Sequence, residues 1–457
     1  MGMGVIVGTP GFLSFYYLAA LGVGYFSGYV LLVFGKDVVY RWRQATGILR
    51  VLNGVVVGLL WLAAIGLPAL LFCENYPHIQ DFNNPAVTQF GREMAKTLPA
   101  TPAVVLADDP AVLYLAMGAS QSLGLPDQYT FIESRALPHG EYLRYLVNRY
   151  PAFHKELVNP DRFPEEISGQ QIGVLLAHLA QRQPVYYLHP SFGSYFERAC
   201  MTPHRLGGDL HPYPSNALAT LVLTPAEIAT NQAYWHTLEK ESLASLPELA
   251  KRSADARRIA NHYSQILDYW GTELQKAATE LKLPPLLKDA MLNDANDQFA
   301  EAFRLNSNNL VARANQQYNA HLRGMPPAGA LIGSSDVAAQ FYNHWDIALN
   351  LYGPADVPDL DIQIGRYFAE RGVYLQAAHL FQRCLELAPH DPAGELDLAK
   401  TYIDLGLVDA AFGLIRDMHG RSTANPLELA GVEALAHVTK NDFAQADKLL
   451  TDEHNKN

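Results

Sequence analysis

The sequence contains little cysteine, which limits the ways in which the chain can be held together. Its 457 residues include only Cys73, Cys200 and Cys384. Their odd number and wide separation provide neither a disulfide framework nor the ligand spacing of a metal site. We therefore expect all three to be buried structural thiols, and we expect no bound metal.

Positive charge is also scarce. The formal net charge is -12, and no run of lysines or arginines interrupts the acidic background. Proteins that bind nucleic acids need a basic face toward the phosphates. The composition therefore argues against a nucleic-acid partner.

Charged residues are missing from two long apolar segments near the N-terminus. Residues 12–34 contain no charged side chain, and residues 51–73 contain only Asn53 as a strongly polar one. A helix of about 20 residues crosses the hydrocarbon core of a bilayer. We predict two transmembrane helices, at about 12–34 and 51–73, in a membrane region that covers residues 1–75.

The loop between these segments carries the basic residues of the membrane region. It contains Lys36, Arg41, Arg43 and Arg50 but only one acidic residue, Asp37. Basic loops stay on the cytoplasmic side of a membrane. We predict a multi-pass protein of the cell inner membrane whose large C-terminal domain is periplasmic or otherwise extracytoplasmic. Tyr40 and Trp42 would lie at the headgroup level.

An α/β module is expected at residues 76–225. Short apolar runs alternate there with helical patterns, which indicates a small parallel or mixed sheet. The strands are expected at 103–107, 128–132 and 184–188, and the helices at 111–122 and 170–181. The glycine pair Gly207 and Gly208 indicates a turn.

Polar side chains follow two of these strands. The candidate ligand-binding residues are Asp108, Asp109, His189, Ser191 and Glu197. Ligands of open α/β sheets bind at the carboxyl ends of strands, so a site is one interpretation. The other is structural, because aspartates after strands also cap helices and form turns. An enzyme acting through Asp108, Asp109, His189 and Glu197 is a further alternative.

Sequence signatures of catalysis are missing. The patterns of serine hydrolases, zinc proteases, phosphate-binding loops and dinucleotide-binding folds do not occur. We therefore predict no catalytic residue and no cofactor.

A repeat of 34 to 35 residues marks the C-terminal region. Gly372, Gly406 and Asn441 recur at this spacing, which is the period of tetratricopeptide (TPR) repeats, in which helix pairs stack into a solenoid. We predict TPR repeats at 355–452, preceded by a helical region with degenerate units at 226–330. The structural positions of the repeats are Gly372, Tyr374, Ala377, Phe381, Pro389, Gly406, Ala411, Phe443 and Ala446. The fold class is therefore a mostly α membrane protein with a small α/β module and a TPR-like solenoid, which would bind a protein partner or pack against the module.

Three stretches carry a resemblance to a known family. Residues 24–35 (GYFSGYVLLVFG), 185–197 (VYYLHPSFGSYFE) and 263–274 resemble bacterial membrane proteins related to the TPR-bearing protein O-mannosyltransferases. The resemblance covers most of this chain but about the latter half of such a protein. It implies the fold of the multi-spanning GT-C glycosyltransferases.

The chain departs from that family in the part that carries the chemistry. GT-C enzymes use an acidic residue in an early extracytoplasmic loop, and no residue here matches it. We expect a non-catalytic C-terminal part, or an accessory subunit, of a glycosyltransferase-like protein. A multi-span transferase subunit would be its partner. The alternative is a free-standing, membrane-anchored TPR scaffold unrelated to sugar transfer.

Overall fold

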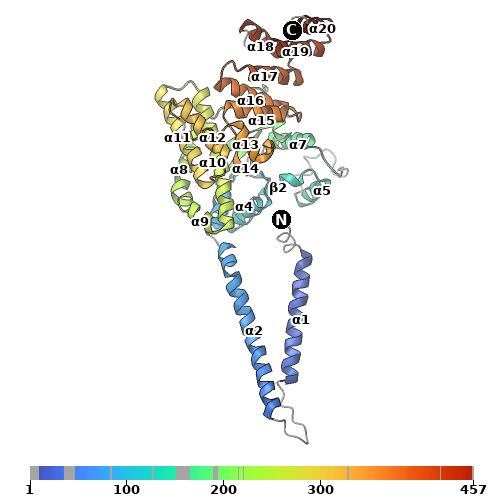
Figure 1. Ribbon diagram of the computed structural model, residues 1–457, viewed down its shortest axis with the longest axis vertical. Coiled ribbons are helices and arrows are strands. Elements are labelled where there is room, and N and C mark those ends of the chain that lie inside the picture. The colour runs from blue at the N-terminus through green and yellow to red at the C-terminus, as the bar shows by residue number, and fades with distance from the viewer. Residues whose placement is uncertain are drawn as a thin grey trace. The chain divides into compact units, whose positions relative to one another are not determined.

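The computed structural model divides the protein into two compact units, Met1–Asn83 and Asn84–Asn457 (Figure 1). Helices dominate both, and a single five-stranded sheet lies within the described part of the second. The structure describes residues 10–34, 47–82, 85–125, 128–150, 165–188, 194–214, 216–219, 221–326, 329–421 and 424–454.

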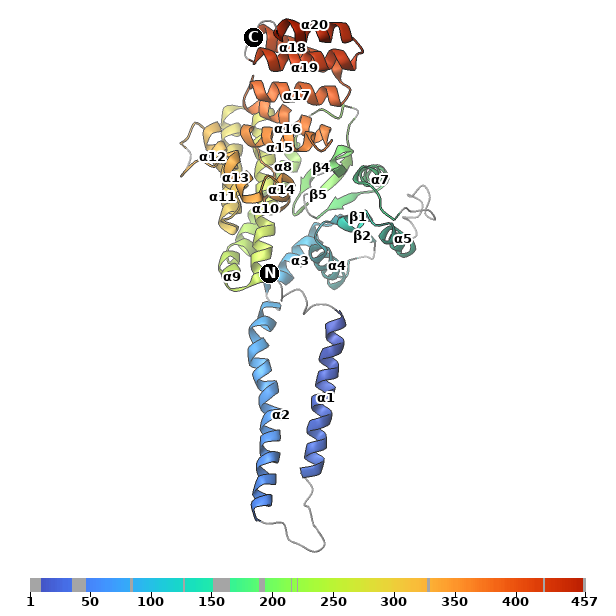
Figure 2. The same ribbon diagram turned by 45° about the vertical axis from the view of Figure 1, so that its right-hand side comes forward.

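The first unit consists of two long helices, α1 (Pro10–Phe34) and α2 (Gly47–Phe82), which run in opposite directions beside each other (Figure 2). Among the described residues, one helical segment, Gly54–Pro77, is long and apolar enough to cross a membrane, and none of it is buried within the protein. The loop that carries Lys36, Arg41 and Arg43 lies outside the described residues, as do Tyr40 and Trp42.

One prediction about the cysteines is wrong. Cys200 and Cys384 are buried, but Cys73 is exposed. It belongs to α2, which continues to Phe82 as one helix and whose apolar segment Gly54–Pro77 is not buried among the described residues. The apolar character of its surroundings in the sequence therefore did not indicate burial inside the protein.

The sheet of the second unit is mixed, with the strand order β2-β1-β3-β5-β4. The predicted strands are confirmed to within about two residues, a normal uncertainty at element ends. They are β1 (Ala103–Ala107), β2 (Tyr129–Glu133) and β3 (Val185–Tyr187), and both neighbours of β1 are parallel to it. The predicted helices are α4 (Pro110–Ser122) and α7 (Gly169–Arg182).

A β-hairpin that the sequence did not predict completes the sheet. It consists of β4 (Ala199–His204) and β5 (Gly207–Pro212), and β5 pairs antiparallel with β3. Gly207 and Gly208 belong to β5 rather than to a turn. A Cβ on Gly207 would lie 2.5 Å from the Tyr187 carbonyl oxygen, and one on Gly208 would lie 2.4 Å from the Met201 side chain. Glycine is therefore required by close approach.

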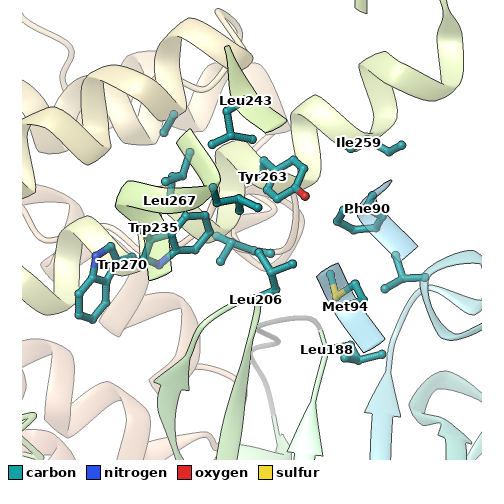
Figure 3. Packing of buried hydrophobic residues seen from close by; sticks show 14 of the residues in the cluster. Phe90, Met94, Leu188, Leu206, Trp235, Leu243, Ile259, Tyr263, Leu267 and Trp270 are labelled. Atoms are coloured by element: carbon teal, nitrogen blue, oxygen red, sulfur yellow. The ribbon is translucent and has the colours of Figure 1, made fainter. Parts of the chain in front are cut away.

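Helices join the sheet to the rest of the second unit. Next to the sheet lie α3 (Pro85–Thr97), η1 (Ser134–Ala136), α5 (Gly140–Arg149) and η2 (Ser194–Glu197). Figure 3 shows the shared core, in which Met94 of α3 and Leu188 after β3 belong to the same hydrophobic cluster as Trp235 and Tyr263. The helices that follow are α8 (Pro225–Leu238), η3 (Glu239–Leu243), α9 (Leu246–Arg252), α10 (Ala254–Glu280), α11 (Pro285–Leu305), α12 (Leu310–Leu322), α13 (Ser334–Phe341) and α14 (Trp345–Tyr352).

The C-terminal helices stack one after another (Figure 2). They are α15 (Pro358–Ala369), α16 (Tyr374–Leu387), α17 (Pro392–Asp404), α18 (Val408–Arg421), α19 (Pro426–Thr439) and α20 (Phe443–His454). The turn residues Gly372, Gly406 and Asn441 have φ values of 73°, 75° and 62°. In each turn the next residue donates its N–H to a carbonyl five residues earlier, at 2.7–3.0 Å. The sequence repeat therefore corresponds to a repeated left-handed helix end.

Close packing within helix pairs also recurs. A Cβ on Gly365 of α15 would lie 2.6 Å from the ring of Phe381 in α16. Gly271 of α10 has the same relation to Phe299 of α11, at 2.5 Å. Ala377, Ala411 and Ala446 are all buried, whereas Phe443 is 61% exposed.

Candidate functional site

The topology of the sheet identifies one edge as a candidate binding site. The chain passes from β1 to β2 on one side and later returns to β3 on the other. Ligands of open α/β sheets bind where the direction of winding changes, at the carboxyl ends of the strands. Asp108 and Asp109 directly follow β1 at this point.

Asp108 is held by two residues, one directly after β2 and one at the end of β3. The side chain is buried, and its Oδ1 accepts hydrogen bonds from the hydroxyl groups of Ser134 in η1 and Tyr187 in β3. Buried carboxylates need such donors, because an unpartnered charge away from water is costly. These bonds tie the carboxyl ends of β1, β2 and β3 together.

Asp109 caps α4 and joins it to α10. Its Oδ1 accepts the backbone N–H of Ala111 at 2.9 Å, and its Oδ2 lies 2.6 Å from Nη2 of Arg258. Burial acts to raise the pKa of Asp109, but the hydrogen bonds from Arg258 and Ala111 and the positive charge of Arg258 lower it on balance. The carboxylate therefore stays ionised near neutral pH and stabilises the start of the helix.

A cavity of about 890 Å³, which we call the β1-end cavity, opens beside the two aspartates. The sheet edge, α3, α4, α10 and α14 form its wall. Its charged and polar lining includes Asp108, Asp109, Arg135, Arg258, His262 and Asp346. Asp346 accepts a hydrogen bond from the hydroxyl group of Tyr367. Charges of both signs thus line a space large enough for a small ligand.

Glu197 lies elsewhere in the second unit. Its carboxylate accepts the backbone N–H groups of Leu375, at 3.0 Å, and Gln376, at 2.9 Å. It therefore caps α16 from η2, which precedes that helix by more than 170 positions in the chain. Burial raises the pKa of Glu197, although these hydrogen bonds oppose the shift. Among the described residues, Glu197 joins the sheet to the repeats and is not in the β1-end cavity.

Two of the five predicted residues thus lie together at the cavity. His189 and Ser191 fall outside the described residues. The described part of the chain contains no group of three or more His, Cys, Asp or Glu side chains able to hold a metal ion. What the site offers is a set of fixed charges that suits binding a polar ligand.

The basic residues of this site were not predicted from the sequence. Arg258 and His262 both line the cavity from α10, four positions apart and hence on one helix face. Arg258 pairs with a residue 149 positions earlier in the chain. Their spacing in the sequence indicates that they share one face of a helix. No nearby sequence pattern indicates that this face contacts the end of β1.

Comparison with known protein families finds no match for this chain, and comparison with curated proteins finds none either.

Proposed function

We propose that this protein is a non-catalytic, membrane-anchored binding protein, namely the C-terminal part or an accessory subunit of a glycosyltransferase-like membrane protein. Its TPR-like helices α15–α20 would bind a protein partner or acceptor. The observation that carries the proposal is the turn repeated at Gly372, Gly406 and Asn441. Stacked helix pairs with this period are typically surfaces for binding peptides or protein domains.

The membrane anchor of this proposal consists of two spans. The apolar segment Gly54–Pro77 supports the second span, and the 25-residue helix α1 supports the first. The basic residues Lys36, Arg41 and Arg43 would hold the connecting loop in the cytoplasm. The second unit would then lie in the periplasm or another extracytoplasmic space.

The contacts of the acidic residues support a non-catalytic role. Asp108 accepts from two hydroxyl groups, Asp109 caps a helix and pairs with Arg258, and Glu197 caps another helix. A general acid or base needs a proton that it can exchange with a substrate. These three carboxylates are instead engaged in contacts between elements of the fold.

The link to sugar transfer rests on the resemblance of residues 24–35, 185–197 and 263–274 to the GT-C-related family. It implies a multi-span transferase subunit as the partner. The alternative, a free-standing membrane scaffold, is favoured by the same stacked repeats, because their packing requires nothing from a transferase.

Affinity purification of the full chain from source membranes tests this proposal. After mild crosslinking, a multi-span membrane protein should co-purify with the full chain. A chain truncated after α16 should lose it, because four helices of the array are then missing. A matched control, Gly413→Ala, changes an open position of α18 with no atom within 4 Å of the new Cβ and should retain the partner.

The results separate the two candidates. A retained multi-span protein supports the transferase link, whereas retention of only soluble proteins supports the scaffold. Equal recovery by the full and truncated chains would exclude the C-terminal helices as the binding surface.

A further inference from the structure

A second cavity, of about 230 Å³, lies between α10, α15, α16 and the β4–β5 hairpin. It is distinct from the β1-end cavity and shares none of that cavity's lining residues. Aromatic rings and charged side chains line it together, among them Tyr213, Tyr269, Lys276, Asp361, Phe368 and Arg383. We call it the repeat cavity.

Asp361 is the unusual member of this wall. The residue is completely buried, and neither of its carboxylate oxygens has a hydrogen-bond partner among the described residues. Buried polar groups nearly always have partners, and a buried carboxylate without one is costly. This residue therefore either carries a proton or awaits a donor from outside the chain.

The nearby cations are already engaged with other carboxylates. Nε and Nη2 of Arg383 lie 2.6 and 2.9 Å from the two oxygens of Asp356. Nη1 of Arg383 also donates to Glu386 at 3.0 Å. Lys276 pairs with Glu273 at 2.9 Å. Neither cation is therefore bonded to Asp361, although both lie close enough to influence its charge.

The balance of charge around the cavity is negative. Two cations, Lys276 and Arg383, face five carboxyl groups, which are those of Glu273, Glu280, Asp356, Asp361 and Glu386. Burial and the neighbouring Glu386 raise the pKa of Glu280 to about 8, so this group is largely neutral at pH 7. The remaining charge still favours a ligand that brings a positive group.

The position of Asp361 within its repeat strengthens this argument. The first helix of a TPR unit follows the pattern Trp-x-x-Leu-Gly-x-x-Tyr. Asp361, Ile364, Gly365 and Phe368 have this spacing, with an aspartate in place of the large aromatic residue. Sequences that break a local rule of their own fold often do so at functional positions.

The following repeat provides an internal comparison. Glu395 of α17 lies 34 positions after Asp361, at the equivalent place. Its Oε1 lies 2.6 Å from Nη2 of Arg421, so this repeat supplies its own cation. In the repeat of Asp361 the cation is Arg383, which is bonded to Asp356 and Glu386 instead.

We propose that the repeat cavity binds an alkylammonium group, such as a lysine side chain or a free amine, with Asp361 as its counter-ion. The rings of Tyr213, Tyr269 and Phe368 provide faces for the cation and its carbon chain. A divalent metal ion does not suit the site, because two cations flank it and no group of metal-binding side chains occurs among the described residues. The inference deepens the proposed binding function but rests on this cavity alone.

Calorimetric titration of the full chain in detergent tests the inference. The probes are N-acetyl-lysine methylamide, its neutral counterpart N-acetyl-norleucine methylamide, and n-butylammonium as the free amine. The wild-type protein should bind the lysine probe at least ~10-fold more tightly than the norleucine probe. Asp361→Asn should weaken binding by about 30-fold or more, since it removes one partner of a buried charge pair. Glu395→Gln, outside the cavity, is the matched control and should bind as the wild type does.

Each outcome has a defined meaning. Binding of both cationic probes supports a site for a peptide-borne lysine, and binding of n-butylammonium alone supports a site for a free amine. Equal binding of the lysine and norleucine probes, no binding at all, or unchanged binding in a folded Asp361→Asn variant would overturn the inference. The comparison of probes uses the wild type, so it stands even where a variant fails to fold. Loss of the membrane partner in the purification experiment would leave these results unaffected.

Discussion

The two cavities of the second unit differ in whether their acidic side chains have hydrogen-bond donors from the fold. At the β1-end cavity, Asp108, Asp109 and Asp346 each have a donor from another element of the fold. In the repeat cavity, Asp361 has none. Satisfied polar groups explain how a structure holds together, whereas an unsatisfied one indicates where something from outside can bind.

The difference also has an energetic side. An unpartnered buried polar group costs about 1–3 kcal/mol, and more when it is charged. The repeat cavity thus gives up stability that the β1-end cavity retains. Removing acids from the two sites should therefore have opposite effects.

The largest effect is expected from breaking the buried ion pair between Arg383 and Asp356 beside the repeat cavity. Arg383→Met leaves Asp356, which has no exposed surface, without its cation. Breaking a buried pair on one side costs about 3–5 kcal/mol. Thermal and urea unfolding should reveal this loss. Arg366→Met, which breaks the more exposed pair with Asp397, is the control and should cost less than about 1 kcal/mol.

A smaller loss is expected at the β1-end cavity. Asp109→Ala removes both the cap of α4 and the partner of Arg258, and should destabilise the second unit by about 1–2 kcal/mol. Asp109→Asn, which keeps an acceptor for the cap, should recover part of this loss. An unchanged melting temperature in Asp109→Ala would show that the cap and the ion pair contribute nothing.

The opposite sign is expected for Asp361. Asp361→Asn replaces the unpartnered carboxylate with a neutral group of the same shape, and should raise stability without ligand by about 1 kcal/mol. Differential scanning fluorimetry of the ligand-free protein measures this. A clear fall in melting temperature would instead make Asp361 a structural residue and would contradict the comparison of the two cavities.

The last effect concerns pH. The folded state raises the pKa of Glu280 from 4.5 to about 8, by burial and by the adjacent Glu386, against the opposing charges of Arg383 and Lys276. Burial likewise raises the pKa of Asp361. The folded state thus keeps protons that the unfolded state loses, so stability falls as pH rises from about 4.5 to about 8.

The contribution of Asp109 to stability depends on pH in the opposite direction. Its pKa is lowered, so its contribution is complete above pH 3.8 and is lost only in acid. Between about pH 5 and pH 8, the melting temperature should therefore fall less steeply with pH in Glu280→Gln than in the wild type. In Asp109→Asn it should fall as steeply as in the wild type. Equal slopes in all three proteins would mean that Glu280 titrates normally.

The sequence predicted those parts of the fold that local patterns determine. The strands β1, β2 and β3 are apolar runs ended by turn residues, and the cap at Asp109 is one of the two roles that its place after a strand suggested. The β4–β5 hairpin was missed because glycine, proline and polar residues interrupt its short strands. Its glycines reflect close contact with Tyr187 and Met201, which no local pattern records.

The site was less predictable, because its contacts join distant parts of the chain. Asp109 meets Arg258 across 149 positions, and Glu197 meets Leu375 across 178. The sequence gives no signal for either pairing. Asp361 was visible as part of the repeat, but its significance depends on the absence of a partner, which only the packed structure reveals.

The repeated left-handed turn has a consequence for how the C-terminal region opens. Each helix of α15–α20 packs mainly on its neighbours in the stack. Stability in such an array is close to one-dimensional, so opening proceeds from a free end. Amide hydrogen exchange should therefore be slowest in α15, where the array meets the rest of the second unit, and faster in the helices farther from it. Asp361 lies at the slow end of that gradient, so its cavity stays formed while the outer helices open and close.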